Sequence, residues 1–410
     1  MDIFVAGVGI TPFRLDLNRS IKTMVKSATS FCLTDSNHAS TDDVEAVFYA
    51  NTAQGVLEGQ VACGGQIALR ASGFQGIPVV NVENACASGS TAFYLAANHL
   101  RAGLADVVMA VGAEKLSTPN SALLGKVFEG GVDVNDMSGV IARLEKFSAG
   151  IKAPAVEGHR SMFMDIYGHW TRAHMRDFGT TQHHLAEIAS KNHFHSTMNP
   201  ICQFQKEFSV DEVLNGRALS YPLTVPMCSP FSDGAAAVML CTEAGLKKLG
   251  FTGDKIKVEA CVLRSGIDRD DTDWSRHVAK LTADDAYQQA GLSPQDMSIA
   301  EVHDATAFGE LLNIENLGFC PRGEGGAFSA SGATRLGGQL PVNVSGGLES
   351  RGHPVGASGL AQIFELVTQL RNQSGKRQVN GANLAIAENG GALYGIEEAC
   401  AVVSILGRQN

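Results

Sequence analysis

The chain has 410 residues, of which 44% are hydrophobic and 18% charged, and its formal net charge is −10. These values are typical of a soluble globular protein with a large interior, and the length predicts two or more packed units. The acidic balance, without a run of lysine or arginine, argues against nucleic-acid binding and against attraction to an anionic membrane. No uninterrupted apolar stretch reaches the roughly 18 residues of a membrane span.

The cysteines and the chain ends favour the cytoplasm as the compartment. Nine cysteines are scattered without a Cys-x-x-Cys pair, so neither a disulfide framework nor a zinc ribbon is supported. The first residues predict a buried strand and lack the basic segment of a signal peptide. The last residues carry no recognisable address.

In chain order, the first clear pattern is an α/β unit around Cys86. Residue spacing predicts a strand over 77–82, a turn at Cys86, a helix over 88–100 and a strand over 105–112. The start of such a helix favours a thiolate, so Cys86 is a candidate nucleophile for covalent acyl chemistry. A buried, unreactive thiol is the commoner fate of a lone cysteine and is the alternative.

A polar, irregular stretch follows this unit. Residues 118–221 are expected to form an inserted loop (lid) domain that caps the first half of the molecule. The first half then comprises residues 1–117 and 222–250 and includes an apolar strand over 234–241. A turn-rich segment near 246–254 joins it to the second half, residues 251–410.

The insertion is rich in histidines, which raises the hypothesis of a metal site. No pair shows the i, i+4 spacing with an accompanying glutamate that is typical of a zinc-binding helix. Solvated or locally hydrogen-bonded histidines are therefore the better interpretation, and no metal is expected. The residues concerned are His159, His169, His174, His183, His184, His193 and His195.

Apolar residues of the insertion allow two interpretations. They would line a pocket for a bulky acyl group, or they would form the core of the loop domain. They are Met162, Phe163, Met164, Ile166, Tyr167 and Trp170.

His303 is expected at the end of a strand and the start of a helix. Its N–H could polarise a carbonyl group in an oxyanion hole. The alternative is that His303 and Asp304 cap the helix, and the pattern alone leaves both open.

The second α/β unit repeats the first. A strand is predicted over 340–344, a glycine-rich turn at His353, a helix over 357–370 and a strand over 382–387. A duplication with a pseudo-two-fold axis would bring the two turns face to face, so that Cys86 and His353 share a pocket. There the imidazole could accept the thiol proton. A structural histidine bonded to backbone carbonyls is the alternative.

Glu388 again follows an apolar strand. It is either an exposed turn carboxylate or an acid/base group at the pocket, and spacing alone favours the turn. Gly390 and Gly391 could offer backbone N–H groups to a second oxyanion.

Together these motifs resemble those of the thiolase superfamily, and most closely the sterol-carrier-protein-type thiolases and related acetyl-CoA acetyltransferases. The resemblance covers nearly the whole chain, and its last motif is highly specific. The motifs are Asn-Ala-Cys-Ala-Ser-Gly at 84–89, Lys-Asn-His-Phe-His at 191–195 with Asn-Pro at 199–200, Ser-Asp-Gly-Ala-Ala-Ala-Val at 232–238, Val-His-Asp at 302–304 and Asn-Val-Ser-Gly-Gly-Leu-Glu-Ser-Arg-Gly-His-Pro at 343–354.

The resemblance implies an α/β, five-layered αβαβα fold with two duplicated halves and a loop domain that helps to hold coenzyme A. It implies a homodimer, or a dimer of dimers, in which the first halves meet. No permanently bound cofactor is implied, because coenzyme A is a substrate. Some relatives of this branch work with a small partner built from a zinc ribbon and an OB-fold, and nothing in this sequence shows such a partner.

The resemblance also implies the chemistry, which is cleavage or formation of a 3-oxoacyl-CoA. Cys86 would take the acyl group, His353 would activate it, and His303 would contribute to an oxyanion hole. The N–H groups of Cys86 and Gly390 would bind the thioester oxygen. The residues expected to contact the substrate are Met162, Asn343, Gly346 and Gly347.

One departure from the family pattern concerns the second acid/base group, which is usually a cysteine. Relatives carry it in a His-Asp-Cys-Phe motif, but Ala305 and Thr306 stand there, and the other usual place holds Glu388. We hypothesise that Glu388 replaces this cysteine as proton shuttle. If neither serves, the chain is a specialised thiolase or a carbon–carbon lyase. A decarboxylating ketoacyl-synthase-like enzyme and a non-catalytic lipid-carrier or scaffold subunit stay as alternatives.

Overall fold

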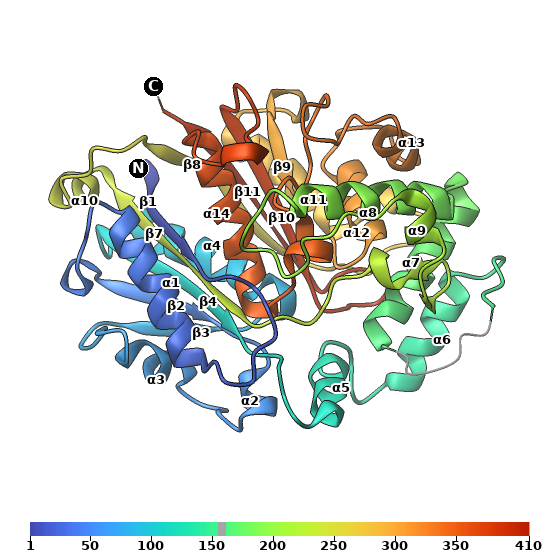
Figure 1. Cartoon of the computed structure of the whole chain (residues 1–410), viewed down its shortest axis with the longest axis horizontal. Helices are drawn as coiled ribbons and strands as arrows, with labels where there is room; N and C mark the ends of the chain where they lie inside the picture. Colours follow the sequence, from blue (N-terminus) through green and yellow to red (C-terminus); the bar gives the residue numbers. More distant parts are fainter. Residues whose placement is uncertain (155–160, 410) are drawn as a thin grey trace.

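The computed structural model describes residues 1–154 and 161–409. Within them, one mixed sheet has the strand order β3-β2-β4-β7-β1-β8-β11-β10-β9 (Figure 1). The strands are β1 (Ile3–Ile10), β2 (Ala46–Ala50), β3 (Val79–Val82), β4 (Val107–Glu114), β7 (Gly234–Thr242), β8 (Ile256–Ser265), β9 (Ile299–Glu301), β10 (Leu384–Gly391) and β11 (Cys400–Arg408).

The sheet has two halves with the same topology, which meet where β1 pairs with β8. From this junction outward the first half runs β1, β7, β4, β2, β3, and the second runs β8, β11, β10, β9. β2 is parallel to both of its neighbours, and β9 is parallel to β10. Ala300 of β9 also forms an isolated parallel bridge with Val342, at the place equivalent to β3. The predicted duplication is confirmed.

Two helices form the central layer of the molecule. They are α4 (Ser88–Arg101) and α14 (Ser358–Leu370), and their small and apolar residues share one core with strands of both halves. Helices α1 (Ile21–Asp35) and α3 (Gly64–Arg70) cover the outer face of the first half. Helices α11 (Val278–Ala290) and α12 (Ala307–Asn316) cover that of the second. Each half of the sheet forms one layer, so the order is helices, first half of the sheet, central helices, second half of the sheet, helices. This is the predicted five-layered arrangement.

Glycines let the two central turns approach each other closely. A Cβ atom at Gly89 of α4 would lie 2.9 Å from the carbonyl oxygen of Gly356, and a Cβ atom at Gly112 of β4 would clash with the same oxygen. The turn that carries His353 therefore packs directly on the backbone of the first half, because no side chain intervenes.

The predicted elements around both turns are confirmed, with shifts of a few residues at their ends, except for the strand over 340–344. Only Val342 pairs there. Asn343 then takes a left-handed conformation (φ 52°) that turns the chain away from the sheet.

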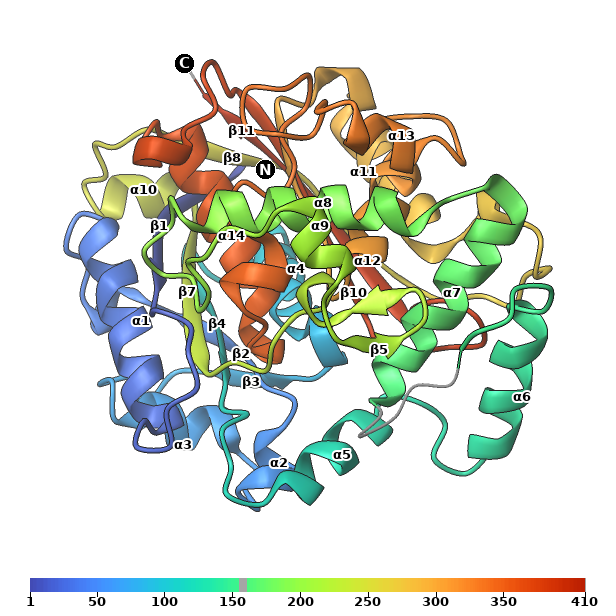
Figure 2. The same cartoon turned by 45° about the vertical axis from the view of Figure 1, so that its right-hand side comes forward.

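Between β4 and β7 the chain forms a mainly helical layer at one side of the sheet (Figure 2). Its apolar side chains form a core with residues of α12. The elements are α5 (Ser121–Glu129), α6 (Met137–Phe147), α7 (Met162–Phe178), α8 (Gln182–Ser196), α9 (Val210–Leu214), β5 (Ala218–Ser220) and β6 (Leu223–Thr224).

The remaining helices are short. They are α2 (Gln54–Leu57), α10 (Glu243–Lys248) and α13 (Gly325–Ala330). Among the described residues, no helix combines the length and hydropathy that crossing a bilayer requires.

Candidate active site

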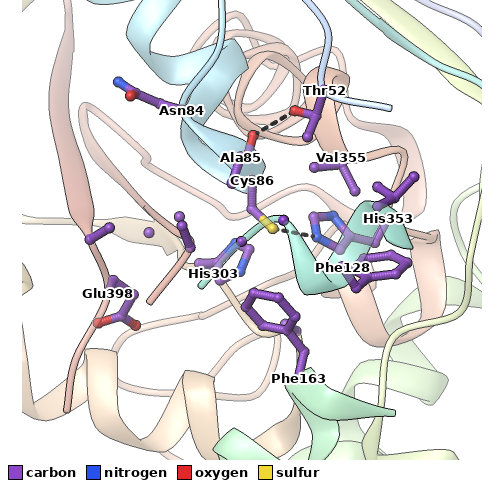
Figure 3. Close-up of a pocket in the computed structure, with 18 of the residues that line it drawn as sticks. Thr52, Asn84, Ala85, Cys86, Phe128, Phe163, His303, His353, Val355 and Glu398 are labelled. Carbon is purple, nitrogen blue, oxygen red and sulfur yellow. Dashed lines mark hydrogen bonds between the residues drawn. The ribbon is translucent and has the colours of Figure 1, made fainter. Parts of the chain in front are cut away.

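A cavity of about 370 Å³ opens where the turns of the two halves meet α7 (Figure 3). Both halves and the insertion contribute to its wall. The chemically active groups of the wall are Cys86, His303, His353, Glu398 and Cys400, and the apolar part includes Phe128, Phe163, Met164, Tyr167, Trp170 and Phe231.

Cys86 lies on a short 3₁₀ turn, Ala85–Ala87, between β3 and α4. Ala85 has a left-handed backbone (φ 49°), an unfavourable conformation for a residue with a side chain. Its carbonyl oxygen accepts hydrogen bonds from the Thr52 and Ser88 hydroxyls at 3.1 and 2.7 Å, and its N–H donates to Glu83 at 2.7 Å. These bonds hold the strained turn and present the half-buried thiol to the cavity.

His353 faces this thiol from the equivalent turn of the second half, with 3.2 Å between its Nε2 and Cys86 Sγ. Its Nδ1 lies 2.6 Å from Ser358 Oγ, and the Ser358 hydroxyl donates to the Pro354 carbonyl. Because that hydroxyl proton is used, Ser358 accepts from Nδ1–H. The Nε2 lone pair then points at the thiol and can accept its proton.

His303 lies beside His353, with 5.4 Å between the ring centroids. Its Nδ1 is 3.0 Å from Asn389 Nδ2, and Asn389 Oδ1 accepts the Ser90 hydroxyl at 2.7 Å. The amide orientation is thereby fixed, so Asn389 donates to Nδ1 and His303 carries its proton on Nε2. This N–H is free to polarise an oxygen atom in the cavity, as an oxyanion hole requires.

Sγ of Cys86 and one ring nitrogen each of His303 and His353 lie within 4.8 Å of one another. Within the described part of the chain, this is the one cluster of cysteine, histidine and carboxylate ligand atoms spaced closely enough for a metal ion. Within this cluster the thiol already pairs with His353.

Cys86, His303 and His353 are uncharged at rest. Burial raises the pKa of the Cys86 thiol to about 12, with a contribution from Cys400. Burial lowers the pKa of His303 to about 4 and holds that of His353 well below its usual value. The prediction that the helix start favours a thiolate is therefore wrong for the resting site, because desolvation outweighs the helix dipole. His353 Nε2, at 3.2 Å, is placed to accept the proton of this thiol.

Glu388 lies outside the residues that line the cavity. Its Oε2 accepts the backbone N–H of His303 at 3.1 Å, and its Oε1 is buried without a hydrogen-bond partner. Burial and the neighbouring Glu398 raise its pKa well above the usual value. Glu388 is thus a buried neutral carboxyl group that supports the His303 turn, and not the exposed turn carboxylate that spacing favoured.

The residues expected to contact the substrate lie in different places. Gly390 lines the cavity, and Met162 lines an adjoining cavity of about 780 Å³. Asn343 is buried, accepts the Val302 N–H and donates to Glu310, so it fixes the backbone. Gly346 and Gly347 pack against Ser196 and Asp304 and line neither cavity.

The apolar residues of α7 serve both expected roles. Phe163, Met164, Tyr167 and Trp170 line the cavity, and Ile166 with Met162 and Met164 lines the adjoining one. Ile166, Tyr167 and Trp170 also belong to the core of the insertion.

The described histidines of the insertion mostly form hydrogen bonds, but His174, His193 and His195 bond to residues of the second half, so the prediction of solvated or locally bonded side chains holds only in part. Partners include Ser148 for His169, Glu315 for His174, Thr181 for His184, Ser350 for His193 and Asn343 for His195. His183 is exposed, and His159 lies outside the described residues.

Two residues of the cavity wall were not predicted. Glu398 lies just before β11 and Cys400 begins it, and both line the cavity. In the ladder, Cys400 lies opposite Gly391. The sequence feature that could have indicated them is the spacing of these two residues, two positions apart, just where the last apolar strand begins.

Comparisons with known proteins follow the same division of the chain. A family model described as the thiolase N-terminal domain matches residues 5–213, and one described as thiolase C-terminal domain-like matches 264–408. Sterol carrier protein 2 of Oryctolagus cuniculus is 36% identical over 94% of this chain and 69% of its own length.

Two further relatives are similar over most of both sequences. An acetyl-CoA acetyltransferase of Methanothermobacter thermautotrophicus is 35% identical and covers 96% of this chain and 97% of its own. The benzoylsuccinyl-CoA thiolase subunit BbsB of Thauera aromatica is 35% identical and covers 92% and 91%.

Solved structures share the fold. An Ltp2-ChsH2(DUF35) aldolase superposes with a TM-score of 0.77 at 20% identity, over 99% of this chain and 98% of that one. Human mitochondrial 3-ketoacyl-CoA thiolase in complex with CoA gives 0.72 at 17% identity, over 100% and 98%.

Proposed function

The chain belongs to the thiolase family, and on that premise we propose that it is an acyl-CoA acyltransferase that cleaves, or forms, a 3-oxoacyl-CoA through an acyl-Cys86 intermediate. The observation that carries the proposal is the 3.2 Å approach of His353 Nε2 to Cys86 Sγ inside the cavity.

In the cleavage direction, Cys86 Sγ attacks the 3-oxo carbon while its proton moves to His353 Nε2. The negative charge that develops on the oxygen is stabilised by the Nε2–H group of His303, which is already oriented by Asn389. The bond between C2 and C3 then breaks. The acyl group stays on Cys86. The carbanion at C2 takes up one proton, which balances the proton that Cys86 gave to His353 and that His353 now releases, and it leaves as the shortened CoA thioester.

The acyl group then passes to coenzyme A. Its thiol gives up a proton to His353 and attacks the acyl-Cys86 carbonyl carbon, and the Cys86 thiolate leaves and is reprotonated from His353. The N–H groups of Cys86 and Gly390 are the proposed donors to the thioester oxygen.

The two cavities suggest where the substrate lies. The cavity that contains Cys86, called the inner cavity, is lined by aromatic and methionine side chains and fits an apolar acyl group. The adjoining cavity is called the outer cavity. The outer cavity shares Phe128, Met164 and Phe231 with it and includes Arg217. We assign the outer cavity to the coenzyme A moiety, with Arg217 as the cation for a phosphate group.

The test is a substrate comparison with purified protein. Cleavage of a 3-oxoacyl-CoA that requires free coenzyme A supports the proposal, provided that Cys86→Ala abolishes it. Condensation that requires a malonyl thioester and releases carbon dioxide would instead support a ketoacyl-synthase-like enzyme. Absence of any acyl transfer would leave a carrier or scaffold role.

A carbon–carbon lyase is the second candidate. Ala305 lines the cavity where relatives carry a cysteine, and one structural neighbour is described as an aldolase. This function predicts cleavage of a 3-hydroxyacyl-CoA to an aldehyde or ketone without added coenzyme A. The thiolase proposal predicts no such product.

We further propose a homodimer. Strand β3 is at the edge of the sheet, is paired on one side with β2, and exposes Val80 to solvent. An unpaired edge strand is a template for pairing with a second copy. The aldolase neighbour is described as a complex with a DUF35 protein, so a small partner of that class is proposed as an additional subunit. Light scattering and co-purification test the two assemblies.

A further inference from the structure

The cavity contains a buried carboxylate that the steps above do not use. Two carboxylates line the cavity wall, Glu83 and Glu398. Glu83 is exposed and binds the N–H of Ala85. Glu398 is only 4% exposed and faces the cavity at the start of β11. In the view of Figure 3 it lies on the far side of His303 from His353.

His277 fixes Glu398 from behind, with 3.2 Å between Nε2 and Oε2. The Nδ1 atom of His277 accepts the Ala279 N–H and the Asn316 amide at 3.3 and 3.2 Å. The Asn316 amide cannot be reversed, because its oxygen accepts from Arg322 at 2.6 Å. Nδ1 is therefore an acceptor, so the proton of His277 is on Nε2, the nitrogen nearest the carboxylate. The contact is one of proximity, because Oε2 of Glu398 makes no hydrogen bond of regular geometry.

The charge state of Glu398 differs from that of Glu388. Burial is the largest influence and would raise the pKa of Glu398, but His277, the backbone N–H of Glu398 itself and His303 together outweigh burial and hold the pKa below the usual value. Glu398 is therefore ionised at neutral pH. The titratable groups that face it are His277, His303, Glu388, Cys400 and Tyr167.

Glu398 also lies beside the proposed thioester position. A Cβ atom at Gly390 would be 2.8 Å from Cγ of Glu398 and 3.3 Å from its carboxyl carbon, so the carboxylate packs directly on this glycine. If the N–H of Gly390 binds the thioester oxygen, the α-carbon of that thioester, two bonds from the oxygen, is close to Glu398.

We propose that Glu398, positioned by His277, is the acid/base group that removes and returns the α-proton of the CoA thioester. This rests on the proposed acyl transfer at Cys86. The role of second acid/base group, which the sequence suggested for Glu388, is thereby assigned to Glu398, a residue that lines the cavity.

Condensation moves one proton from the α-carbon of the thioester to Cys86. The Glu398 carboxylate takes a proton from the α-carbon, and the electron pair of that C–H bond forms the new bond to the acyl-Cys86 carbonyl carbon. The C–S bond to Cys86 breaks, and the proton that Glu398 took is passed on to the Cys86 thiolate, so that the Glu398 carboxylate and the Cys86 thiol are both regenerated. Cleavage reverses these steps and needs the protonated form of Glu398.

The test follows the α-proton directly. The protein is incubated with excess acetyl-CoA in D₂O, and deuterium in the thioester methyl group is measured by mass spectrometry. We expect wild type to catalyse exchange and Glu398→Gln to slow it by about 10²-fold or more, the usual weight of a general base. Glu398→Gln should still form acyl-Cys86, because attack on the acyl group depends on His353.

The outcomes separate this inference from the proposed function. Acylation of Glu398→Gln with exchange at the wild-type rate would overturn the inference and leave acyl transfer intact. Exchange lost in Glu388→Gln but kept in Glu398→Gln would overturn it in favour of Glu388. A third outcome is that the wild type exchanges the α-proton but forms no acyl-Cys86, and that Glu398→Gln loses the exchange. This outcome would support the inference and remove the proposed function.

His277 has its own readout as a positioning residue. Without its N–H the pKa of Glu398 rises, so His277→Ala should move the acidic limb of the exchange rate to higher pH. His277→Gln keeps an N–H donor and should move that limb less. An unchanged pH profile in His277→Ala would contradict the positioning role.

Discussion

The imidazole rings of His303 and His353 lie 5.4 Å apart at an interplanar angle of 73°, and each is held by a different side-chain partner. Asn389 donates to Nδ1 of His303, whereas Ser358 accepts from Nδ1 of His353. The two neutral rings therefore offer opposite functions to the cavity. One presents an N–H donor and the other a lone pair, as a nucleophilic mechanism with an oxyanion requires.

The first prediction concerns the reactivity of Cys86 with pH. Because its thiol pKa is raised to about 12 and alkylation requires the thiolate, the rate with iodoacetamide should rise by about tenfold per pH unit across the neutral range. Peptide mass spectrometry separates Cys86 from the exposed Cys63, which serves as internal reference. A plateau of the Cys86 rate at or below pH 7 would show a resting thiolate.

The second prediction concerns the orientation of His303. In Asn389→Asp, a carboxylate replaces the amide donor, so Nδ1 of His303 becomes the protonated nitrogen and Nε2 an acceptor. We expect kcat to fall by about 10²–10³-fold with little change in KM, as for the loss of an oxyanion donor. Ser90→Ala removes only the outer hydroxyl and should cost less. Equal losses in both variants would argue against the donor role.

The third prediction couples the fold to the site. Gly112→Ala places a methyl group against the Gly356 carbonyl, so the turn that carries His353 must move. Overpacking of this kind costs about 1–3 kcal/mol, which urea unfolding measures, and activity should fall as well. Gly125→Ala is the matched control for stability alone, because its Cβ atom meets nothing within 4 Å on helix α5 and the residue lines the adjoining cavity. That variant should be neutral or more stable by up to about 1 kcal/mol.

The fourth prediction concerns the acyl pocket. Phe163 lines the cavity and packs edge-on against Phe128 at 6.1 Å. Phe163→Ala should enlarge the cavity and shift the preference, measured as kcat/KM across a series of acyl-CoA lengths, toward longer acyl groups. Phe163→Leu should give an intermediate result. An unchanged preference in both variants would place the acyl group elsewhere.

The sequence was sufficient for the duplicated halves and for the pairing of Cys86 with His353. Each turn begins a helix of small residues, and two equivalent turns related by a pseudo-two-fold axis must face each other. His303 was recognised for the same reason, since strand β9 ends just before it. Its tautomer was not predictable, because Asn389 and Ser90 reach it from other elements.

Whether Glu388 or Glu398 reaches the cavity depends on where each lies along its strand, which a sequence pattern does not show. Glu388 is two residues inside β10 from Gly390, about 6.6 Å from the cavity rim at 3.3 Å per residue. The backbone of His303 therefore covers it. Glu398 faces the cavity because β11 begins beside Gly390 and Gly391, a register that only the folded sheet defines. Asn343 was misassigned for a similar reason, since its side chain completes backbone hydrogen bonds.

The central claim is that Cys86 carries the acyl group, and intact-protein mass spectrometry after incubation with acetyl-CoA tests it most directly. The wild type should gain one acetyl group, which peptide mapping places on Cys86, and Cys86→Ala should gain none. An unmodified wild type, or an equal gain in Cys86→Ala, would contradict the account.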